Sequence, residues 1–190
     1  MKPFLVLLPT ILLAQDPAKL LPVTHQPDGK WTARNASTKP ISVYFVHYNA
    51  DAMRAGINVA AWLREGWGQD DALIAPGATV NVLAKPEVFA VHVVAIIFGD
   101  GTVAGEARTV DGLDLVELIF RRRAIEVATL KEYLALDAAG VEARLATERD
   151  GGTYEDQARQ AAVDLVRRLD RAALQKRLAF IEPSSARRVR

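Results

Sequence analysis

The sequence contains no cysteine among its 190 residues. It therefore forms no disulfide, holds no thiolate-bound metal and has no thiol nucleophile. An excess of charge of one sign is lacking as well, because 24 lysine and arginine residues are balanced by 23 aspartate and glutamate residues. A net charge of +1 does not provide the basic footprint that nucleic-acid binding requires. We therefore expect no nucleic-acid partner.

The common catalytic and metal-binding motifs are also missing. There is no H-x-H or H-E-x-x-H pair, no G-x-S-x-G or S-x-x-K nucleophile and no phosphate-binding glycine loop. His47 and His92 lie within predicted strands, and His25 lies in the N-terminal lead-in. A catalytic or metal-binding pair would need both histidines on one face with a third ligand nearby. We therefore predict structural histidines, no catalytic residue, no metal and no cofactor.

Long hydrophobic runs are few, and the first lies at the N-terminus. Met1-Lys2 is a short positive segment, Phe4–Leu13 is apolar, and Ala14 offers a small residue for cleavage. This layout is that of a secretory signal peptide. A transmembrane anchor is the alternative, but the run is shorter than the roughly 20 residues that span a bilayer, and Pro9 interrupts it. We predict a signal peptide over residues 1–14, export to the periplasm or the exterior, and no stable membrane span after cleavage.

The second apolar run, Val88 to Phe98, is the stretch around which the rest of the chain is organised. Its even and its odd positions are both apolar, so the predicted strand should be covered on both faces. Gly99-Asp100-Gly101 follows the run. We expect Asp100 and Gly101 to be the two central residues of a tight hairpin turn, both with positive φ.

Shorter strands precede this run, after an extended lead-in over residues 15–28. Strands are predicted at 31–35, 41–48 and 80–83, with turn signals between them. Pro76-Gly77 suits the centre of a type II turn. Several short strands separated by turns predict a small antiparallel β-sandwich over residues 29–112. For residues 50–71 the sequence leaves two interpretations open. The segment forms either a helix with one apolar stripe or a short strand with loops.

After Gly112 the hydrophobic period becomes that of a helix. Asp114 is a suitable N-cap for a first long helix, which Gly140 ends. A shorter helix is predicted over residues 141–149. The Asp150-Gly151-Gly152 tripeptide then forms a turn.

A second long helix is predicted after this turn. Thr153, with Asp156 three residues later, approximates a capping box, and helical apolar positions continue until Pro183 ends the helix. Residues 183–190 form a basic tail. Two long helices joined by a glycine turn predict an α-helical hairpin over residues 113–182 that covers the second face of the central strand. There are two alternatives: the helices pack only on each other, or they pack on a partner protein. The predicted fold class is therefore α+β.

Three runs carry a resemblance to a known group of proteins: Asn35-Ala36-Ser37-Thr38-Lys39-Pro40-Ile41, Leu73-Ile74-Ala75-Pro76-Gly77 and Ile97-Phe98-Gly99-Asp100-Gly101-Thr102-Val103-Ala104-Gly105. They resemble the N-x-S-x-K-P-I, P-G and F-x-D-G-T motifs of uncharacterised exported bacterial proteins, acidobacterial ones especially. The resemblance implies an immunoglobulin-like β-sandwich over roughly residues 30–106, and it implies no activity. Ala104 departs from the pattern, because an aromatic residue often stands there.

Four aromatic residues are the candidate ligand-binding set, namely Tyr44, Tyr48, Trp62 and Trp67. Exposed aromatic rings can form a platform for a sugar, whereas buried ones belong to the core or rim of the sandwich. No polar constellation accompanies these four, which favours the core or rim.

The strongest charge run is Arg121-Arg122-Arg123. Successive helical residues point about 100° apart, so three in a row do not form one binding face. Arg123 lies within the apolar stripe and is expected to pair with a carboxylate, while the other two are solvated. An anion site is the alternative.

Taken together, these features predict a non-catalytic module that acts by binding a protein partner. The first alternative is a module that binds a carbohydrate or another envelope ligand through the aromatic set. The second is a hydrolase with a site built from loops, which a cleft joining His47 or His92 to a carboxylate would favour.

Overall fold

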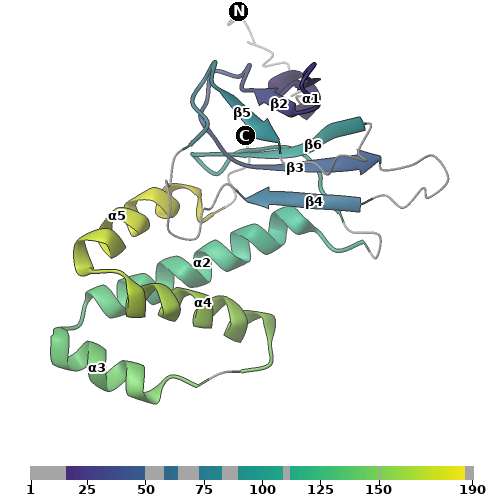
Figure 1. Cartoon of the computed structure of the whole chain (residues 1–190). Helices are drawn as coiled ribbons and strands as arrows, with labels where there is room; N and C mark the ends of the chain where they lie inside the picture. Colours follow the sequence, from purple (N-terminus) through teal and green to yellow (C-terminus); the bar gives the residue numbers. More distant parts are fainter. Residues whose placement is uncertain are drawn as a thin grey trace, which may run out of the picture.

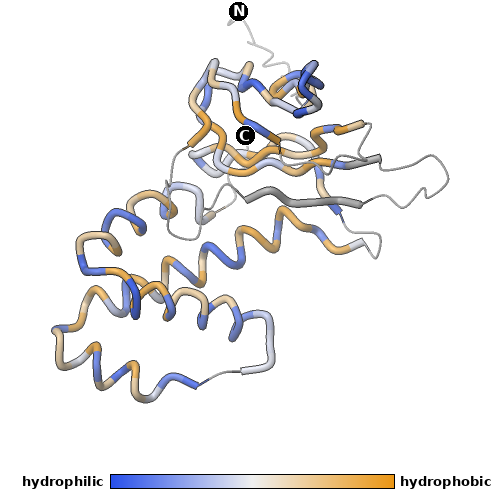
Figure 2. The backbone as a smooth tube through the Cα atoms, in the orientation of Figure 1, coloured by the Kyte–Doolittle hydropathy of each residue, from blue (hydrophilic) through white to orange (hydrophobic). Residues whose placement is uncertain are grey.

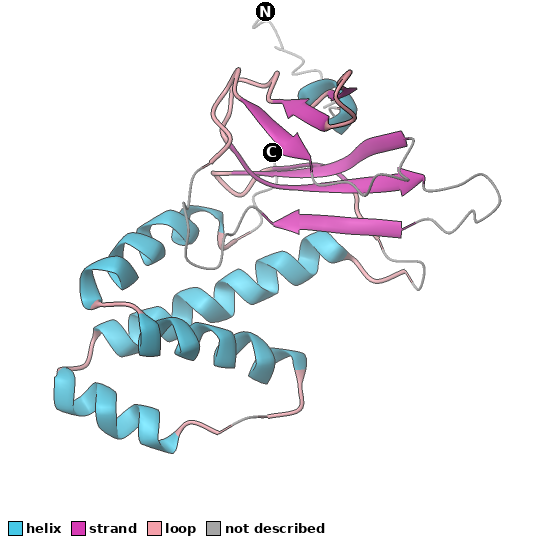
Figure 3. Cartoon of the chain, viewed as in Figure 1, coloured by secondary structure: helices cyan, strands magenta, loops and turns pink. Residues whose placement is uncertain are grey.

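The structure is a computed structural model, and the residues it describes are 16–49, 58–63, 73–82, 90–108, 112–149 and 151–186. For residues 48–49 and 58–63 only the backbone is described. The fold is mixed α+β, with two small antiparallel sheets followed by a group of helices (Figure 1, Figure 3). The α+β class predicted from the sequence is confirmed.

Within the described residues, the smaller sheet has the strand order β1-β2-β5 and the larger sheet has the order β4-β3-β6-β7. All neighbouring strands pair in the antiparallel sense. The strands are β1 (Val23–His25), β2 (Trp31–Arg34), β3 (Ile41–Asn49), β4 (Asn58–Leu63), β5 (Thr79–Val82), β6 (Ala90–Phe98) and β7 (Val103–Gly105).

The lead-in is more regular than its prolines suggest. Pro17–Leu20 form a short helix, α1, whose N-cap Asp16 accepts a hydrogen bond from the backbone N–H of Ala18. Leu21 is completely buried, so it fixes this segment to the core before β1 begins. This differs from the uniformly extended lead-in expected over residues 15–28.

The larger sheet carries a hydrophobic cluster on each face. Most of β6 has the hydrophobic colour in Figure 2. The inner cluster lies between the two sheets, and the outer cluster lies between the larger sheet and helix α2. The inner cluster includes Ala33, Val80 and Val82 of the smaller sheet and Tyr44, Val46, Val91, Val93, Ile96 and Phe98 of the larger sheet. The outer cluster includes Val43, Phe45, Ala95, Ile97, Val116, Ile119 and Phe120. The part of β6 from Val94 to Phe98 is therefore covered on both faces, and a C-terminal helix provides the second cover, as predicted; the outer face at His92 is exposed.

The strict alternation expected along the central run fails at one place. The register between β3 and β6 shifts between Phe45 and Val46, because Phe45 pairs with Ala95 while Val46 pairs with Val93. Val94 is thus the extra residue of a β-bulge, which leaves two residues of one strand opposite one of the other. Val91, Val93 and Ile96 consequently share the inner face, although their numbers differ in parity.

The two turns have different outcomes. The backbone N–H of Ala78 donates to the carbonyl of Ala75, and Gly77 has φ +79°, so the type II turn is confirmed. At the hairpin, the N–H of Gly101 donates to the carbonyl of Phe98, which places Gly99 and Asp100 at the centre of the turn.

Gly101 follows that turn with φ +81°. This is the three-residue hairpin loop in which a turn is followed by a glycine in the left-handed conformation. The two-residue turn expected at Asp100-Gly101 is therefore wrong, although the need for glycine at position 101 is confirmed.

The C-terminal part contains α2 (Leu115–Leu134), α3 (Ala138–Thr147), α4 (Tyr154–Arg168), α5 (Arg171–Ile181) and the short 3₁₀ helix η1 (Glu182–Ser184). Asp114 caps α2 by accepting from the N–H of Glu117. Thr153 and Asp156 form the expected capping box at the start of α4.

The second long helix expected after residue 152 is divided into α4 and α5. Leu169 has an extended backbone, with φ −105° and ψ 146°, and the side chain of Asp170 caps α5 by accepting from the N–H of Ala173. The apolar periodicity continues through this break, which explains why the hydrophobic pattern alone does not reveal it.

Helix α4 runs alongside α2 in the same direction (Figure 1). At the start of α4, the hydroxyl of Tyr154 donates to the carbonyl of Leu118 in the first turn of α2. Further along α4, Arg159 pairs with Glu132 near the end of α2.

Helix α5 returns antiparallel to α2. Arg171, at its start, donates to the carbonyl of Leu134 at the end of α2, while Arg177 pairs with Glu126 in the middle of α2. The described residues of the C-terminal part therefore form a unit of four α-helices, where the sequence predicts two long helices and one shorter helix. Among the described residues, none of the helices combines the length and the apolar character needed to cross a bilayer.

Candidate functional site

Two sequence motifs meet at one end of the sheets. The side chain of Asn35 is completely buried, and its amide donates to the carbonyls of Lys39 and Ile74, both at 2.8 Å. Its oxygen accepts from the backbone N–H and the hydroxyl of Ser37. The N-x-S-x-K-P-I motif therefore closes its own loop over residues 35–39 and attaches it to the backbone at Ile74, which is a structural role.

Lys39 connects this motif to the hairpin. Its ammonium group forms an ion pair with Asp100, and the hydroxyl of Thr102 donates to the other oxygen of that carboxylate at 2.6 Å. Burial alone would raise the pKa of Asp100, but the hydrogen bonds from Lys39 and Thr102 outweigh it and hold the pKa well below its ordinary value. The F-x-D-G-T motif thus fixes the hairpin against residue 39.

Arg123 links the sheet to the C-terminal segment. Its side chain is 1% exposed and donates to the hydroxyl of Ser42 in β3 at 2.6 Å and to the hydroxyl of Ser184 in η1 at 2.9 Å. These contacts join two hydroxyl groups, one from β3 and one from η1, at the end of a single side chain on α2. The carboxylate partner expected for Arg123 from the sequence stays a prediction.

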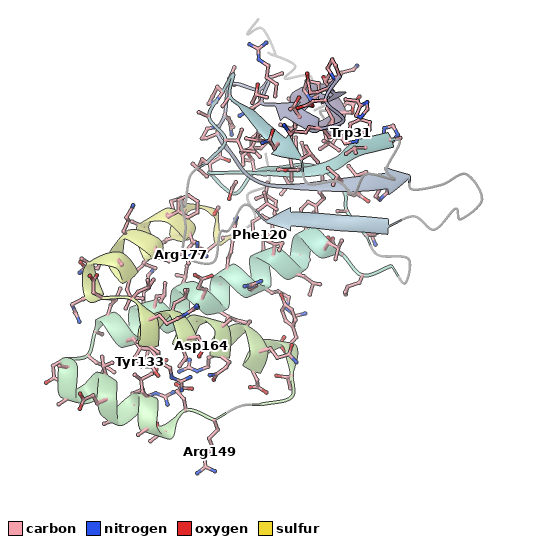
Figure 4. The ribbon with its side chains drawn as sticks, in the orientation of Figure 1. Trp31, Phe120, Tyr133, Arg149, Asp164 and Arg177 are labelled. Atoms are coloured by element: carbon pink, nitrogen blue, oxygen red, sulfur yellow. The ribbon has the colours of Figure 1, made fainter. Side chains whose placement is uncertain are left out.

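A second buried arginine holds α5 to α2. Arg177 forms a bidentate pair with Glu126, with Nε to Oε1 at 2.7 Å and Nη2 to Oε2 at 3.2 Å. Both side chains are about nine-tenths or more buried. Figure 4 shows Arg177 between the helices, whereas Arg149 projects away from them.

A network of polar side chains joins α2, α3 and α4. Glu132 accepts from Arg144 at 2.8 Å and from Arg159 at 3.0 Å. Glu148, which follows α3, accepts from Arg159 at 2.8 Å and from the hydroxyl of Tyr133 at 3.0 Å.

The pKa values follow from these contacts. The hydrogen bond from Arg144 lowers the pKa of Glu132, and the one from Arg159 lowers the pKa of Glu148. Burial, together with the hydrogen bond to Glu148, raises the pKa of Tyr133 to about 12. The charges in this network satisfy one another, so the network stabilises the helical unit.

The structure brings two of the three histidines together. His47 of β3 is directly opposite His92 of β6 in the antiparallel register. Burial, followed by the nearby charge of His92, lowers the pKa of His47. His25 lies elsewhere, in β1, where its ring contacts Trp31. Sequence spacing could not reveal the pair, because its two members are 45 residues apart and meet only through the strand register.

The aromatic set is only partly described. Tyr44 is 4% exposed and belongs to the inner cluster, so its ring is part of the core. Its backbone is opposite Trp62 in the pairing of β3 with β4, and Tyr48 is opposite Asn58. The side chains of Tyr48 and Trp62, and the whole of Trp67, lie outside the described residues.

An exposed group of cations surrounds the break between α4 and α5. We call Arg167, Arg168, Arg171 and Lys176 the basic corner; all four are exposed. Only two carboxylates lie in the same stretch, Asp164 and Asp170, so residues 164–176 have a net charge of +2.

The contacts of the basic corner are partly to backbone oxygen. Arg168 donates to the carbonyl of Asp164, and Arg171 donates to the carbonyls of Leu134 and Leu136. Arg167 pairs with the carboxylate of Asp164 at 2.9 Å. The sequence signal for this group was the density of arginine after residue 166, but its concentration at a corner depends on the helix break.

Within the described parts of the chain, no group of three or more histidine, aspartate or glutamate side chains is arranged to hold a metal ion. No family model matches the chain, and the comparisons with curated proteins and with solved structures found no match either.

Proposed function

We propose that the protein is an exported, non-catalytic module that binds a protein partner carrying an acidic surface. The observation that supports this proposal is the basic corner. It presents four exposed cations within ten residues, and two of its guanidinium groups donate to backbone carbonyls. A carboxylate brought by a partner would form a stronger, charge-assisted hydrogen bond than a neutral carbonyl does.

The rigidity of the helical unit also supports the proposal. Helix α5 is attached to α2 through the buried Arg177–Glu126 pair, and α2 is attached to the sheet through Arg123 and the outer cluster. A surface that is already ordered loses little conformational entropy when a partner binds. The basic corner therefore meets the two requirements of a recognition surface, charge and fixed geometry.

The experiment is a charge reversal that leaves the buried Arg177–Glu126 pair intact and removes one exposed hydrogen bond, from Arg168 to the carbonyl of Asp164. Arg168→Glu combined with Lys176→Glu changes two exposed side chains of the basic corner. Lys30→Glu combined with Arg108→Glu is the matched control, because it reverses two exposed cations on the sheet side of the molecule.

Each variant is immobilised and used to capture proteins from a periplasmic extract over a range of salt concentrations. We expect the corner variant to lose about tenfold or more in affinity for a captured partner, because like charges then face one another. The control should bind as the unaltered protein does. Equal capture by the two variants, or binding that does not weaken with added salt, would contradict the proposal.

We also propose export through cleavage of a signal peptide over residues 1–14, an immunoglobulin-like arrangement of the two sheets, and an α-helical hairpin over residues 113–182. Support for export comes from the order of charged, apolar and small residues at the N-terminus. Support for the sandwich comes from the inner cluster that both sheets share. N-terminal sequencing of the protein recovered from the periplasm tests the cleavage.

A further inference from the structure

His47 and His92 are opposite one another on neighbouring strands of the larger sheet. The Cβ atoms of residues in such a cross-strand pair are about 4.5–5.5 Å apart, and their side chains leave the sheet on the same face. At this Cβ separation, two imidazole rings can both reach one small ion between them.

The neighbouring residues identify the face. Val46 and Val93, next to the two histidines in sequence, belong to the inner cluster. Because successive side chains of a strand point to opposite faces, His47 and His92 lie on the outer face. Further along the same face, Phe45 and Ala95 are covered by α2.

Helix α2 does not cover the part of the outer face on which the histidine pair lies. His92 is exposed and His47 is half-buried, whereas Phe45 and Ala95 are completely buried. The two rings are therefore on the outer face of the sheet at a place that solvent and ions can reach.

We propose that His47 and His92 form a bidentate binding site for a divalent transition-metal ion. Imidazole nitrogen is a ligand suited to Cu²⁺, Ni²⁺ and Zn²⁺, whereas Mg²⁺ and Ca²⁺ prefer oxygen. By the usual order of stability, Cu²⁺ binds most tightly. Two ring nitrogens leave the other coordination positions of the ion to water. Because the site lacks the third protein ligand of a catalytic zinc site, the ion should bind more weakly there and exchange readily.

The chain offers a convenient control, because it contains only three histidines. His25 lies on the smaller sheet against Trp31 and has no histidine opposite it among its register partners. His25→Ala therefore removes one imidazole and leaves the pair intact, while His92→Ala removes an exposed member of the pair at little cost to folding.

The test uses the full chain without an affinity tag, with CuCl₂ and ZnCl₂ as probes and MgCl₂ as the ion expected not to bind. Calorimetric titration measures the affinity, and broadening of the histidine ring proton signals by Cu²⁺ identifies the ligands. We expect one ion per chain, with the signals of His47 and His92 broadened together before that of His25.

Loss of one ring should weaken binding roughly tenfold or more, since the second contact of a bidentate ligand is intramolecular. His92→Ala and His47→Gln are both expected to show this loss, and His25→Ala is expected to bind as the unaltered protein does. Unchanged affinity in His92→Ala, or broadening of all three histidines at the same Cu²⁺ concentration, would overturn the proposal. The result does not depend on the basic corner, so it is independent of the proposed protein partner.

Discussion

Arg123 is the third of three consecutive arginines, yet its side chain is buried while that of Arg121 is exposed. The helical period separates them, as the sequence predicts, because residues 121 and 123 point about 200° apart around the axis. The sequence could not predict the partners of Arg123. The hydroxyls of Ser42 and Ser184 come from segments that are distant along the chain and reach α2 only in the folded molecule.

The raised pKa of Tyr133 predicts how the stability of the protein depends on pH. Its pKa is raised to about 12, so the folded protein retains the hydroxyl proton at a pH where the unfolded chain, with the ordinary value of 10.0, has lost it. The stability that depends on this hydroxyl is therefore fully present below pH 10 and is lost as the pH rises towards 12. We expect the free energy of unfolding, measured in urea, to fall over this range.

Tyr133→Phe is the control for this prediction, because it removes the titrating group and keeps the ring. The variant should be less stable at neutral pH, since Glu148 loses a hydrogen bond. It should also show a smaller decline in alkali than the unaltered protein. Identical pH profiles for the two proteins would contradict the assignment.

At the scale of the element, the hairpin between β6 and β7 offers a matched pair of glycines. Gly101 and Gly77 both have positive φ, near +80°. A Cβ atom at position 77 would meet nothing within 4 Å, whereas one at position 101 would overlap the backbone carbonyl oxygen of Ala186. The two positions share the conformational cost of alanine and differ in this contact.

Gly77→Ala should therefore lower the free energy of unfolding by about 1–2 kcal/mol, the cost of a left-handed conformation. Gly101→Ala should lower it by more, because residue 186 must also move. Thermal melts followed by circular dichroism measure both changes. Equal melting temperatures for the two variants would show that residue 186 does not restrain the hairpin.

Some features of the helices and strands could be predicted from the sequence, and others could not. Local signals located β2, β3, β5 and β6, the type II turn at Pro76-Gly77 and the N-caps of α2 and α4. The bulge at Val94 and the break at Leu169 have no comparable signal, because apolar residues continue through both. The register that brings His47 to His92 depends on pairing between distant strands, so it became known only with the fold.

At the scale of the whole molecule, the outer cluster joins the sheets to the helical unit. Figure 4 shows Phe120 between α2 and the larger sheet. Removing all residues after Gly112 would expose Val43, Phe45, Ala95 and Ile97, which are completely buried in the full chain. We expect the truncated chain to bind a hydrophobic dye and to lose cooperative thermal unfolding.

Phe120→Ala in the full chain is the milder form of the same test. Removing this ring from the outer cluster should cost about 3–5 kcal/mol of stability, without removing any other contact of the helices. A truncated chain that melts cooperatively at the original temperature would show that the sheets are stable alone. Because we expect the opposite, point variants are better suited than truncation to locating a binding surface.

Ser184 contacts Arg123, and Ala186 lies against the hairpin at Gly101. These two contacts bear on the order in which parts of the fold form during synthesis. The ribosome makes the strands first, and the segment that closes over the hairpin is made only after all four helices. Domains generally fold as units once their last contacts are available. The sheet therefore remains without this restraint until the ribosome has passed residue 186, after α2, α3, α4 and α5 have been made.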